Sequence, residues 1–93
     1  MQFVLIIHEV ADYAAWKVVF DKTAALRRAA GEVTYQVLKY QDDPNRIVHF
    51  SRWKSLDAAR SFFESDTLVE IRRQASVKTA EFVYLDQIES GAL

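Results

Sequence analysis

Two histidines are the side chains of this sequence best suited to move a proton near neutral pH. His8 and His49 are the only histidines among the 93 residues, and imidazole is the side chain whose unperturbed pKa lies near neutrality. Each falls in a segment expected to form a central strand. A histidine that lines a dry pocket could act as a general base and take a proton from a bound ligand. A histidine hydrogen-bonded at a sheet end or in a dimer interface fits the same positions, so both interpretations stay open.

Arg52 is the residue expected to stabilise an anion beside such a base. It follows Phe50 at strand spacing, so the two side chains share one face of the sheet. We expect Arg52 to face inward near the strand end, where a guanidinium would hold a carboxylate or an oxyanion. Arg72 has the same potential. The alternative is an ion pair with an acid such as Glu9, because most arginines are solvated or paired.

Aromatic residues make up 13% of the chain and could form the walls of a ligand site. Aromatic walls suit a flat, apolar ligand, and hydroxyl groups can orient it. The alternative is that these rings simply fill the core, where aromatic stripes at helical spacing are more often found. Besides His8 and Arg52, the residues predicted to contact a ligand are Phe50, Trp16, Trp53, Phe62, Tyr84 and His49.

Several chemistries are excluded by what the sequence lacks. It contains no cysteine, which removes disulfides, thiolate catalysis and sulfur-ligated zinc. His8 and Glu9 are neighbours on a strand and point to opposite faces, so a metal would lack its third ligand and no metal is expected. Ser51, Ser61 and Ser65 have no histidine and acid at a recognisable spacing, and no glycine-rich phosphate loop is present. Neither a nucleophilic hydrolase nor a nucleotide site is predicted.

The charge and the N-terminus indicate where the protein works and what it does not bind. A net charge of −1 provides no basic surface for nucleic acid. The apolar run Phe3–Ile7 is far shorter than the ~20 residues that span a bilayer. The first residues lack the charged region and cleavage site of a signal peptide, and a small secreted domain would usually carry disulfides. We expect a cytoplasmic protein with no nucleic-acid or membrane partner.

Strand patterns occur in four segments of the chain. The first is largely apolar and β-branched with no helical spacing, which is typical of a buried strand, and the second alternates with period two. The segment Asp42–Asn45 contains Pro44 and has turn chemistry, so a hairpin joins the two middle strands. The predicted strands are residues 2–10, 33–41, 46–53 and 78–88.

Helical periodicity fills the two intervals between strands. Asp12 can accept hydrogen bonds from free backbone N–H groups, and the apolar stripe that follows predicts one helix to about Ala30. Ser55 is expected to cap a second helix in the same way. A short third helix then begins at Ser65 or Asp66.

The order βαββαβ predicts one α+β domain over residues 1–93 with a ferredoxin-like fold. This topology gives a four-stranded antiparallel sheet with the helices on one face. The first strand is apolar on both sides, with Leu5 on one and Ile6 on the other. The face without helices is too apolar to stay in water. A second copy packed sheet to sheet, with two-fold symmetry, would cover it. We therefore predict a homodimer.

Two segments of the sequence resemble the dimeric α/β-barrel superfamily, and within it the antibiotic-biosynthesis-monooxygenase-like group. In Ile47–Leu56 a strand ends in Trp53 and enters a capped helix, which continues through Phe62 and Phe63. The opening segment His8–Lys17 also resembles members of this superfamily. Together with the element order, the resemblance covers essentially the whole chain.

The resemblance implies a homodimer with one pocket per subunit, between sheet and helices, and no metal, flavin or other cofactor. In the better-known enzymes of the group, an electron-rich phenol, quinol or haem itself reacts with oxygen. Haem-degrading members keep an Asn, a Trp and a His where this sequence has Ile7 or His8, Phe62 and Arg72, so haem degradation is not expected. Three hypotheses remain: a cofactor-independent monooxygenase of a small aromatic or quinol-type molecule, a binding module for an apolar metabolite, and a filled core that has no pocket.

Overall fold

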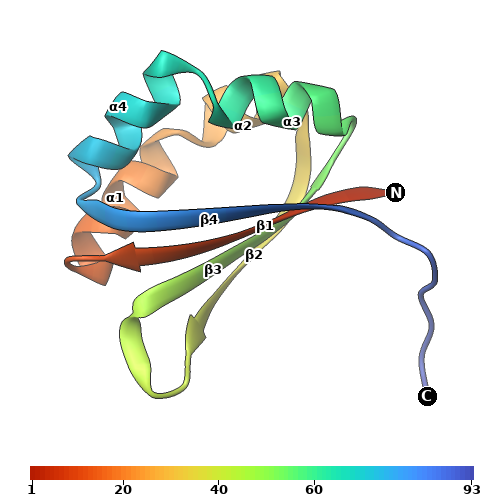
Figure 1. Cartoon of the computed structure of the whole chain (residues 1–93), viewed down its shortest axis with the longest axis horizontal. Helices are drawn as coiled ribbons and strands as arrows, with labels where there is room; N and C mark the ends of the chain where they lie inside the picture. The colour runs from red at the N-terminus through yellow and green to blue at the C-terminus, as the bar shows by residue number, and fades with distance from the viewer.

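Four strands form one antiparallel sheet, and four helices cover one of its faces (Figure 1). The computed structural model describes residues 1–93. The elements in chain order are β1 (Gln2–Val10), α1 (Tyr13–Lys22), α2 (Ala24–Ala30), β2 (Glu32–Tyr40), β3 (Asp43–Trp53), α3 (Leu56–Phe63), α4 (Asp66–Gln74) and β4 (Val77–Asp86).

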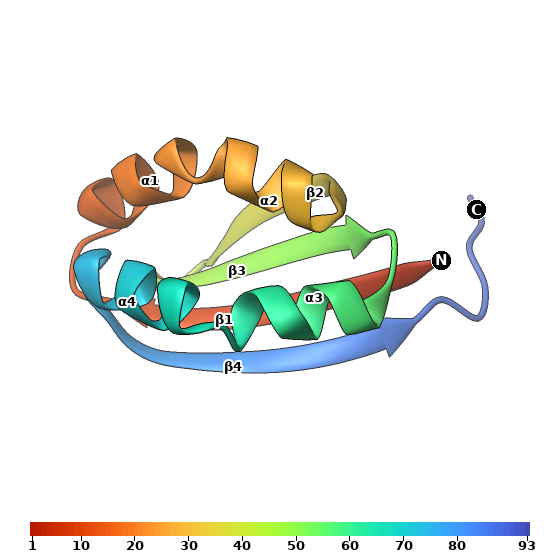
Figure 2. The ribbon, with the colours of Figure 1, turned by 90° about the horizontal axis from the view of Figure 1, so that it is seen from above.

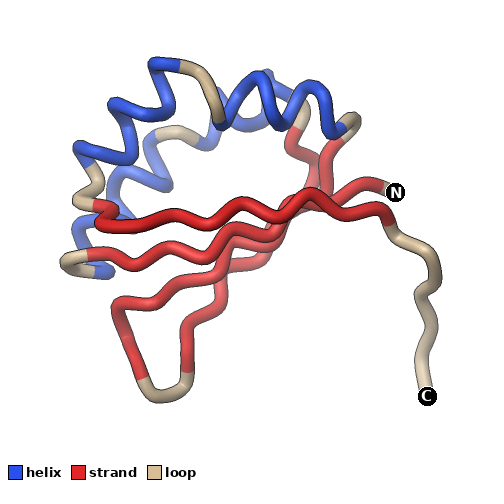
Figure 3. The backbone as a smooth tube through the Cα atoms, viewed as in Figure 1, coloured by secondary structure: helices blue, strands red, loops and turns tan.

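The strands lie in the order β2-β3-β1-β4, so β3 and β1 occupy the centre of the sheet. His8 in β1 is paired with Ile47 of β3 and Ala80 of β4, and His49 is paired with Ile6. The predicted α+β, ferredoxin-like βαββαβ fold is confirmed. Seen from above, α1 and α2 run along one edge of the sheet, and α3 and α4 return along the opposite edge (Figure 2). The backbone trace shows all helices on the same side of the strands (Figure 3).

Alternation along the central strands decides which side chains meet the helices. In β1 the residues buried under the helices are Val4, Ile6, His8 and Val10. The intervening positions, such as Leu5, are only half-buried and face the open side of the sheet. Successive strand side chains point to opposite faces, so the prediction that Leu5 and Ile6 face opposite ways is confirmed. His8 therefore belongs to the row that the helices cover.

Each predicted helix start is capped by a side-chain oxygen. Asp12 accepts a hydrogen bond from the Ala15 N–H at 3.2 Å, and Ser55 accepts from the Ala58 N–H at 3.0 Å. At the third start it is Ser65, rather than Asp66, that accepts from the next turn. These bonds satisfy backbone donors that the first helical turn leaves free. The caps fix where α1, α3 and α4 begin and hence where their inner faces lie.

The single helix expected up to about Ala30 is instead two helices that meet at Thr23. The Thr23 hydroxyl donates to the Phe20 carbonyl at 2.9 Å, while the Thr23 N–H contacts the carbonyls of Val19 and Phe20. A hydroxyl that competes for a helical carbonyl bends a helix. Gly31, with φ of 121°, then ends α2 in a conformation that costs glycine little.

The predicted hairpin is present, but its turn lies earlier than expected. Gln41 and Asp42 form the turn, and β3 already begins at Asp43. The pairing register then shifts between Lys39 and Tyr40. The Asp43 carboxylate accepts from the Asn45 N–H at 3.0 Å. Residues 43–45, which were predicted to belong to the turn, are therefore the irregular start of β3.

A buried charged cluster fastens α2 to the sheet. Arg27 of α2 forms an ion pair with Glu32 at the start of β2, and His49 Nε2 lies 3.1 Å from Glu32 Oε2. All three residues are less than one-tenth exposed. The Arg27 guanidinium also stacks on the Phe20 ring of α1, 3.8 Å from its centroid. Both helices of the first crossover are thereby tied to β2 and β3.

Removing one charge from this cluster should destabilise the fold strongly. Glu32→Ala leaves Arg27 buried without a counter-ion, and we expect a loss of about 3–5 kcal/mol in the free energy of unfolding, measured by urea denaturation. The control is Glu70→Ala, which breaks an exposed pair with Arg73 and should change stability by less than about 0.5 kcal/mol. Equal effects of the two substitutions would contradict a stabilising role for the cluster.

Candidate functional site

His8 lies on the wall of a small cavity between the sheet and the helices. The cavity has a volume of about 50 Å³. Its apolar walls come mainly from α1 and α4, and the polar groups around it are His8, Thr23, Arg27 and Arg72. Trp16 of α1 packs against the imidazole, with ring centroids 5.5 Å apart. The cavity thus lies where a pocket between sheet and helices was expected, although it is far smaller than an aromatic molecule requires.

His8 is held neutral by its surroundings. Its side chain is 5% exposed, and its Nδ1 atom is buried with no hydrogen-bond partner. Burial, together with charge repulsion from His49 and Arg72, lowers the pKa of His8 from 6.5 to about 3. Leaving a buried polar atom unpaired costs free energy. Such atoms are uncommon in folded proteins. A group of this kind beside a cavity is a candidate for contact with a ligand.

Arg72 provides a positive charge beside the same cavity. Its guanidinium donates to the Phe63 carbonyl at 3.0 Å and lies over the Phe82 ring, 5.0 Å from the centroid. No carboxylate lies within ion-pair distance of it. Burial lowers the pKa of Arg72, which reflects the cost of keeping this cation away from water. An anion in the cavity would compensate that charge.

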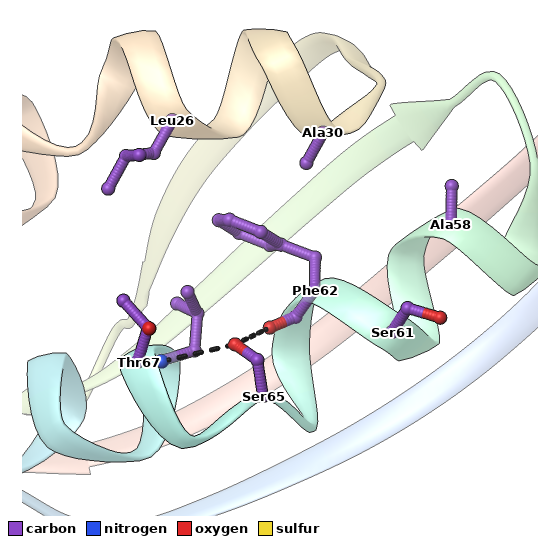
Figure 4. A pocket seen from close by; sticks show the side chains of 8 residues that line it. Leu26, Ala30, Ala58, Ser61, Phe62, Ser65 and Thr67 are labelled. Carbon is purple, nitrogen blue, oxygen red and sulfur yellow. Dashed lines mark hydrogen bonds between the residues drawn. The ribbon is translucent and has the colours of Figure 1, made fainter.

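A larger, open groove lies above this cavity between α2 and the α3–α4 turn. Its volume is about 450 Å³, which is within the usual range for small-molecule sites. The Phe62 ring reaches from α3 toward Leu26 and Ala30 of α2 (Figure 4). Leu68 contributes to the groove and also to the cavity beside His8. One leucine side chain therefore borders both spaces, and the region between the helices is not a completely filled core.

The other predicted ligand contacts are divided among three places. Trp16 borders the cavity and Phe62 borders the groove. Trp53 is 3% exposed within the core, where its indole N–H donates to the Ser51 hydroxyl at 2.8 Å. Tyr84 is on the helix-facing side of β4, half-buried under the Arg60 guanidinium. Trp53 and Tyr84 border neither of these two spaces.

Arg52 and Phe50 lie on the open face of the sheet, away from His8. Arg52 is paired with Phe3, and Phe50 stacks on Phe3 with ring centroids 5.1 Å apart. Arg52 donates to the Met1 sulfur rather than to any group near the cavity. The expectation that Arg52 faces inward beside His8 therefore does not describe this structure. Successive strand side chains alternate between the two faces of a sheet. Residues 50 and 52 therefore point to the face opposite the buried residues of β3.

His49 faces the helices but is engaged in the charged cluster with Glu32. Its ring meets the Phe20 ring edge to face, 5.0 Å between centroids. Neither histidine takes part in a group of three or more potential metal ligands. His49 thus lies near the cavity as part of its supporting structure, while His8 lines the cavity itself.

The role of α4 in the site was the main feature missed from the sequence. Leu68, Ile71, Arg72 and Ala75 border the cavity, and they are spaced i, i+3, i+4 and i+7. That spacing places them on one helical face. The signal was present in the sequence, but Arg72 interrupts an otherwise apolar stripe. The fold was needed to show that this stripe faces His8.

The geometry and the sequence together identify a protein family. The sequence pattern of the antibiotic biosynthesis monooxygenase family matches residues 11–74, and the chain belongs to this family. Compared with curated protein sequences, the chain finds no match. None of its helices combines the length and apolar character needed to cross a bilayer.

Solved structures of low sequence identity share the fold. SnoaB from Streptomyces nogalater, described as a cofactor-independent oxygenase, is 22% identical, with 96% of this chain and 93% of that chain covered and a TM-score of 0.75. Rv0793 from Mycobacterium tuberculosis is 17% identical, with 99% and 100% covered and a TM-score of 0.70. At these identities the likeness establishes the fold, and chemistry has to be argued from the site.

The neutral, buried state of His8 predicts a pH dependence of stability. The folded-state pKa of about 3 lies below the ordinary 6.5, so the unfolded chain binds more protons between these pH values. Stability should fall as the pH drops through that window, by up to ~1.4 kcal/mol per pH unit from this group. Unfolding of the wild type and His8→Gln, compared from pH 7 to 4, should show a shallower slope in the variant. Parallel slopes would mean that His8 titrates normally.

Proposed function

We propose that this protein is a cofactor-independent monooxygenase that acts on a small aromatic or quinol-type molecule. The observation that carries the proposal is His8, a buried neutral imidazole with an unpaired Nδ1 atom on the wall of a cavity. Family membership supports the reaction class, and the cofactor-independent oxygenase SnoaB supports it at the level of the fold. The substrate would bring its own electrons, so no metal or flavin is required.

His8 would accept the phenolic proton, and Arg72 would stabilise the anion that forms. With no ligand bound, the pKa of about 3 makes His8 a weak base. A phenolate beside it would favour the charged imidazolium. Arg72 disfavours that imidazolium and favours the phenolate, so it lowers the cost of ionising the substrate. Arg72 thus takes the role first assigned to Arg52.

The groove would hold the ring of the substrate, because it alone of the two spaces has sufficient volume. Phe62 provides an aromatic wall, and Leu68 borders both the groove and the cavity beside His8. A ring in the groove would direct its hydroxyl past Leu68 toward the imidazole. For a simple phenol, the ring C–H opposite the hydroxyl becomes C=O. One atom of dioxygen enters the quinone, and the other leaves as water with the two hydrogens lost.

Oxygen uptake with a panel of phenols and quinols tests this assignment. His8→Gln removes the proton acceptor and should lower kcat/KM by about 10²–10⁴-fold. Arg72→Gln removes the anion-stabilising charge and should lower kcat by about 10²–10³-fold. Arg73→Gln is the matched control, since this neighbouring guanidinium is exposed and pairs with Glu70. It should leave the rate unchanged.

Two results would overturn the enzymatic proposal. If His8→Gln turns over a substrate as fast as the wild type, His8 is not the base. If the wild type binds aromatic molecules, by fluorescence of Trp16 and Trp53, but consumes no oxygen with any of them, the protein is a binding module. The small volume beside His8 is the observation that favours this second function.

We further propose that the active form is a cytoplasmic homodimer joined through the open sheet face. That face carries the stacked Phe3 and Phe50 rings, half-exposed Leu38, and Leu85 with 37% exposure. An apolar surface of this kind is usually covered. A two-fold copy of the same face would cover it and support a domain with a small core.

Phe50→Glu should convert the dimer to a monomer. The substitution places like charges opposite each other in a symmetric interface and replaces a stacked ring, so association should weaken by at least an order of magnitude. Sedimentation velocity at several protein concentrations measures it. The control is Val18→Glu, on the helix side with 54% exposure. A wild type that sediments as a monomer at all concentrations would contradict the proposal.

A further inference from the structure

Two aromatic rings on α1 connect the interior of the protein with its surface. Trp16 packs against the imidazole of His8, and only 4% of its side chain is exposed. Tyr13 lies three residues earlier on the same helix, and its ring centroid is 6.0 Å from that of Trp16. Residues three apart are neighbours on a helix surface. Since Tyr13 is 38% exposed, a buried indole and a solvent-exposed phenol lie side by side.

These two side chains are also the pair best able to pass an electron. In a chain without cysteine, indole and phenol groups lose one electron more readily than the other side chains. An oxidised Trp16 would take an electron from Tyr13, because a tyrosyl radical that has released its proton is lower in free energy at neutral pH. The phenol O–H of Tyr13 can give that proton to water. The favourable direction of electron transfer is therefore from Tyr13 inward to Trp16.

The other aromatic neighbours do not offer such a route. Trp16 also stacks on Phe20, with centroids 4.8 Å apart, but a phenylalanine ring is far harder to oxidise. Tyr35 packs on the far side of that phenylalanine, at 5.4 Å from its centroid. The second tryptophan, Trp53, packs against phenylalanines of α3. Tyr13 is thus the tyrosine that packs directly on a tryptophan.

We propose that Trp16 and Tyr13 form an electron-transfer path that protects the buried site against one-electron oxidation. The path carries an oxidising equivalent out to the surface, where a reductant in solution can remove it. The inference rests on the proposed function for the source of the oxidant, whereas the path itself depends only on the two rings. Trp16 and Tyr13 would then have a task beyond packing α1 on the sheet.

The oxidant would be an oxyl radical, left when the O–O bond of a peroxide formed during oxygenation breaks homolytically. It takes one electron from Trp16 and one proton from solvent, and becomes a hydroxyl group. The Trp16 radical cation is reduced by one electron from Tyr13, whose phenolic proton passes to water. A thiol in solution then gives a hydrogen atom to the tyrosyl radical and becomes a thiyl radical. Both side chains are thereby restored.

Flash photolysis of the full chain tests the path without any substrate. Light at the long-wavelength edge of the tryptophan band, where tyrosine does not absorb, ejects an electron from tryptophan whatever its burial. A scavenger removes that electron. Part of the tryptophanyl absorption should then decay in a fast phase, while tyrosyl absorption grows at the same rate. A wild type in which no tyrosyl radical forms in this phase would overturn the proposal.

Tyr13→Phe is the decisive variant, because it keeps the ring and removes only an exposed hydroxyl. The fast phase should disappear in Tyr13→Phe and persist in the matched control Tyr35→Phe. Trp53→Phe should also keep the fast phase, since only the second tryptophanyl signal is removed. A fast phase that survives Tyr13→Phe would assign the transfer to another tyrosine and contradict the path.

The protective role is tested by counting turnovers in the oxygenase assay. Tyr13→Phe should begin at the wild-type rate and become inactive after severalfold fewer turnovers, with oxidation products at Trp16 detected by mass spectrometry. Equal numbers of turnovers in the two proteins would overturn the protective role. A fast phase in the flash experiment without oxygen uptake for any phenol would mean that the proposed function fails and the electron path stands.

Discussion

The structure depends on one central strand that carries apolar side chains on both faces. Six of the nine residues of β1 are apolar, and its pleat sends one row of side chains under the helices and the other to the open side. The helices of a βαββαβ chain lie on one face only, as they do here. His8 occupies the helix-covered row between Ile6 and Val10. Its burial, its neutral state and its place beside the cavity all follow because residue 8 points to the helix-covered face of β1.

Two polar clusters share the core, and they differ in how their charges are balanced. Arg27 and Glu32 neutralise each other, with His49 beside them, and such a cluster is what a structural fastening requires. His8 and Arg72 have no acidic partner, and each is energetically unfavourable as it stands. Local violations of good packing and pairing are typical of functional sites. This contrast separates the group proposed for chemistry from the group that supports it.

The sheet also separates two surfaces with different side chains. The helix side contains the cavity and the groove, and the open side contains Arg52 with the stacked Phe3 and Phe50 rings. A one-residue change of register would exchange these two sets of side chains. The pairing of β1 with β3 and β4 therefore decides which arginine lies on the same side of the sheet as His8. It also leaves the opposite face free for association.

The sequence by itself determined the order of elements, the caps Asp12 and Ser55 and the two faces of β1, because these follow from local hydrogen bonding and from periods of 2 and 3.6 residues. It also indicated His8 and the family. The break at Thr23 and the early turn at Gln41 were not predicted from the sequence, since each depends on competition between a few local hydrogen bonds. The placement of His8 and Arg72 on one cavity, and the position of Leu68 between cavity and groove, were decided by tertiary structure alone. His8 is some sixty positions from Leu68 and Arg72, and only the packing of α4 over the sheet brings them to one cavity.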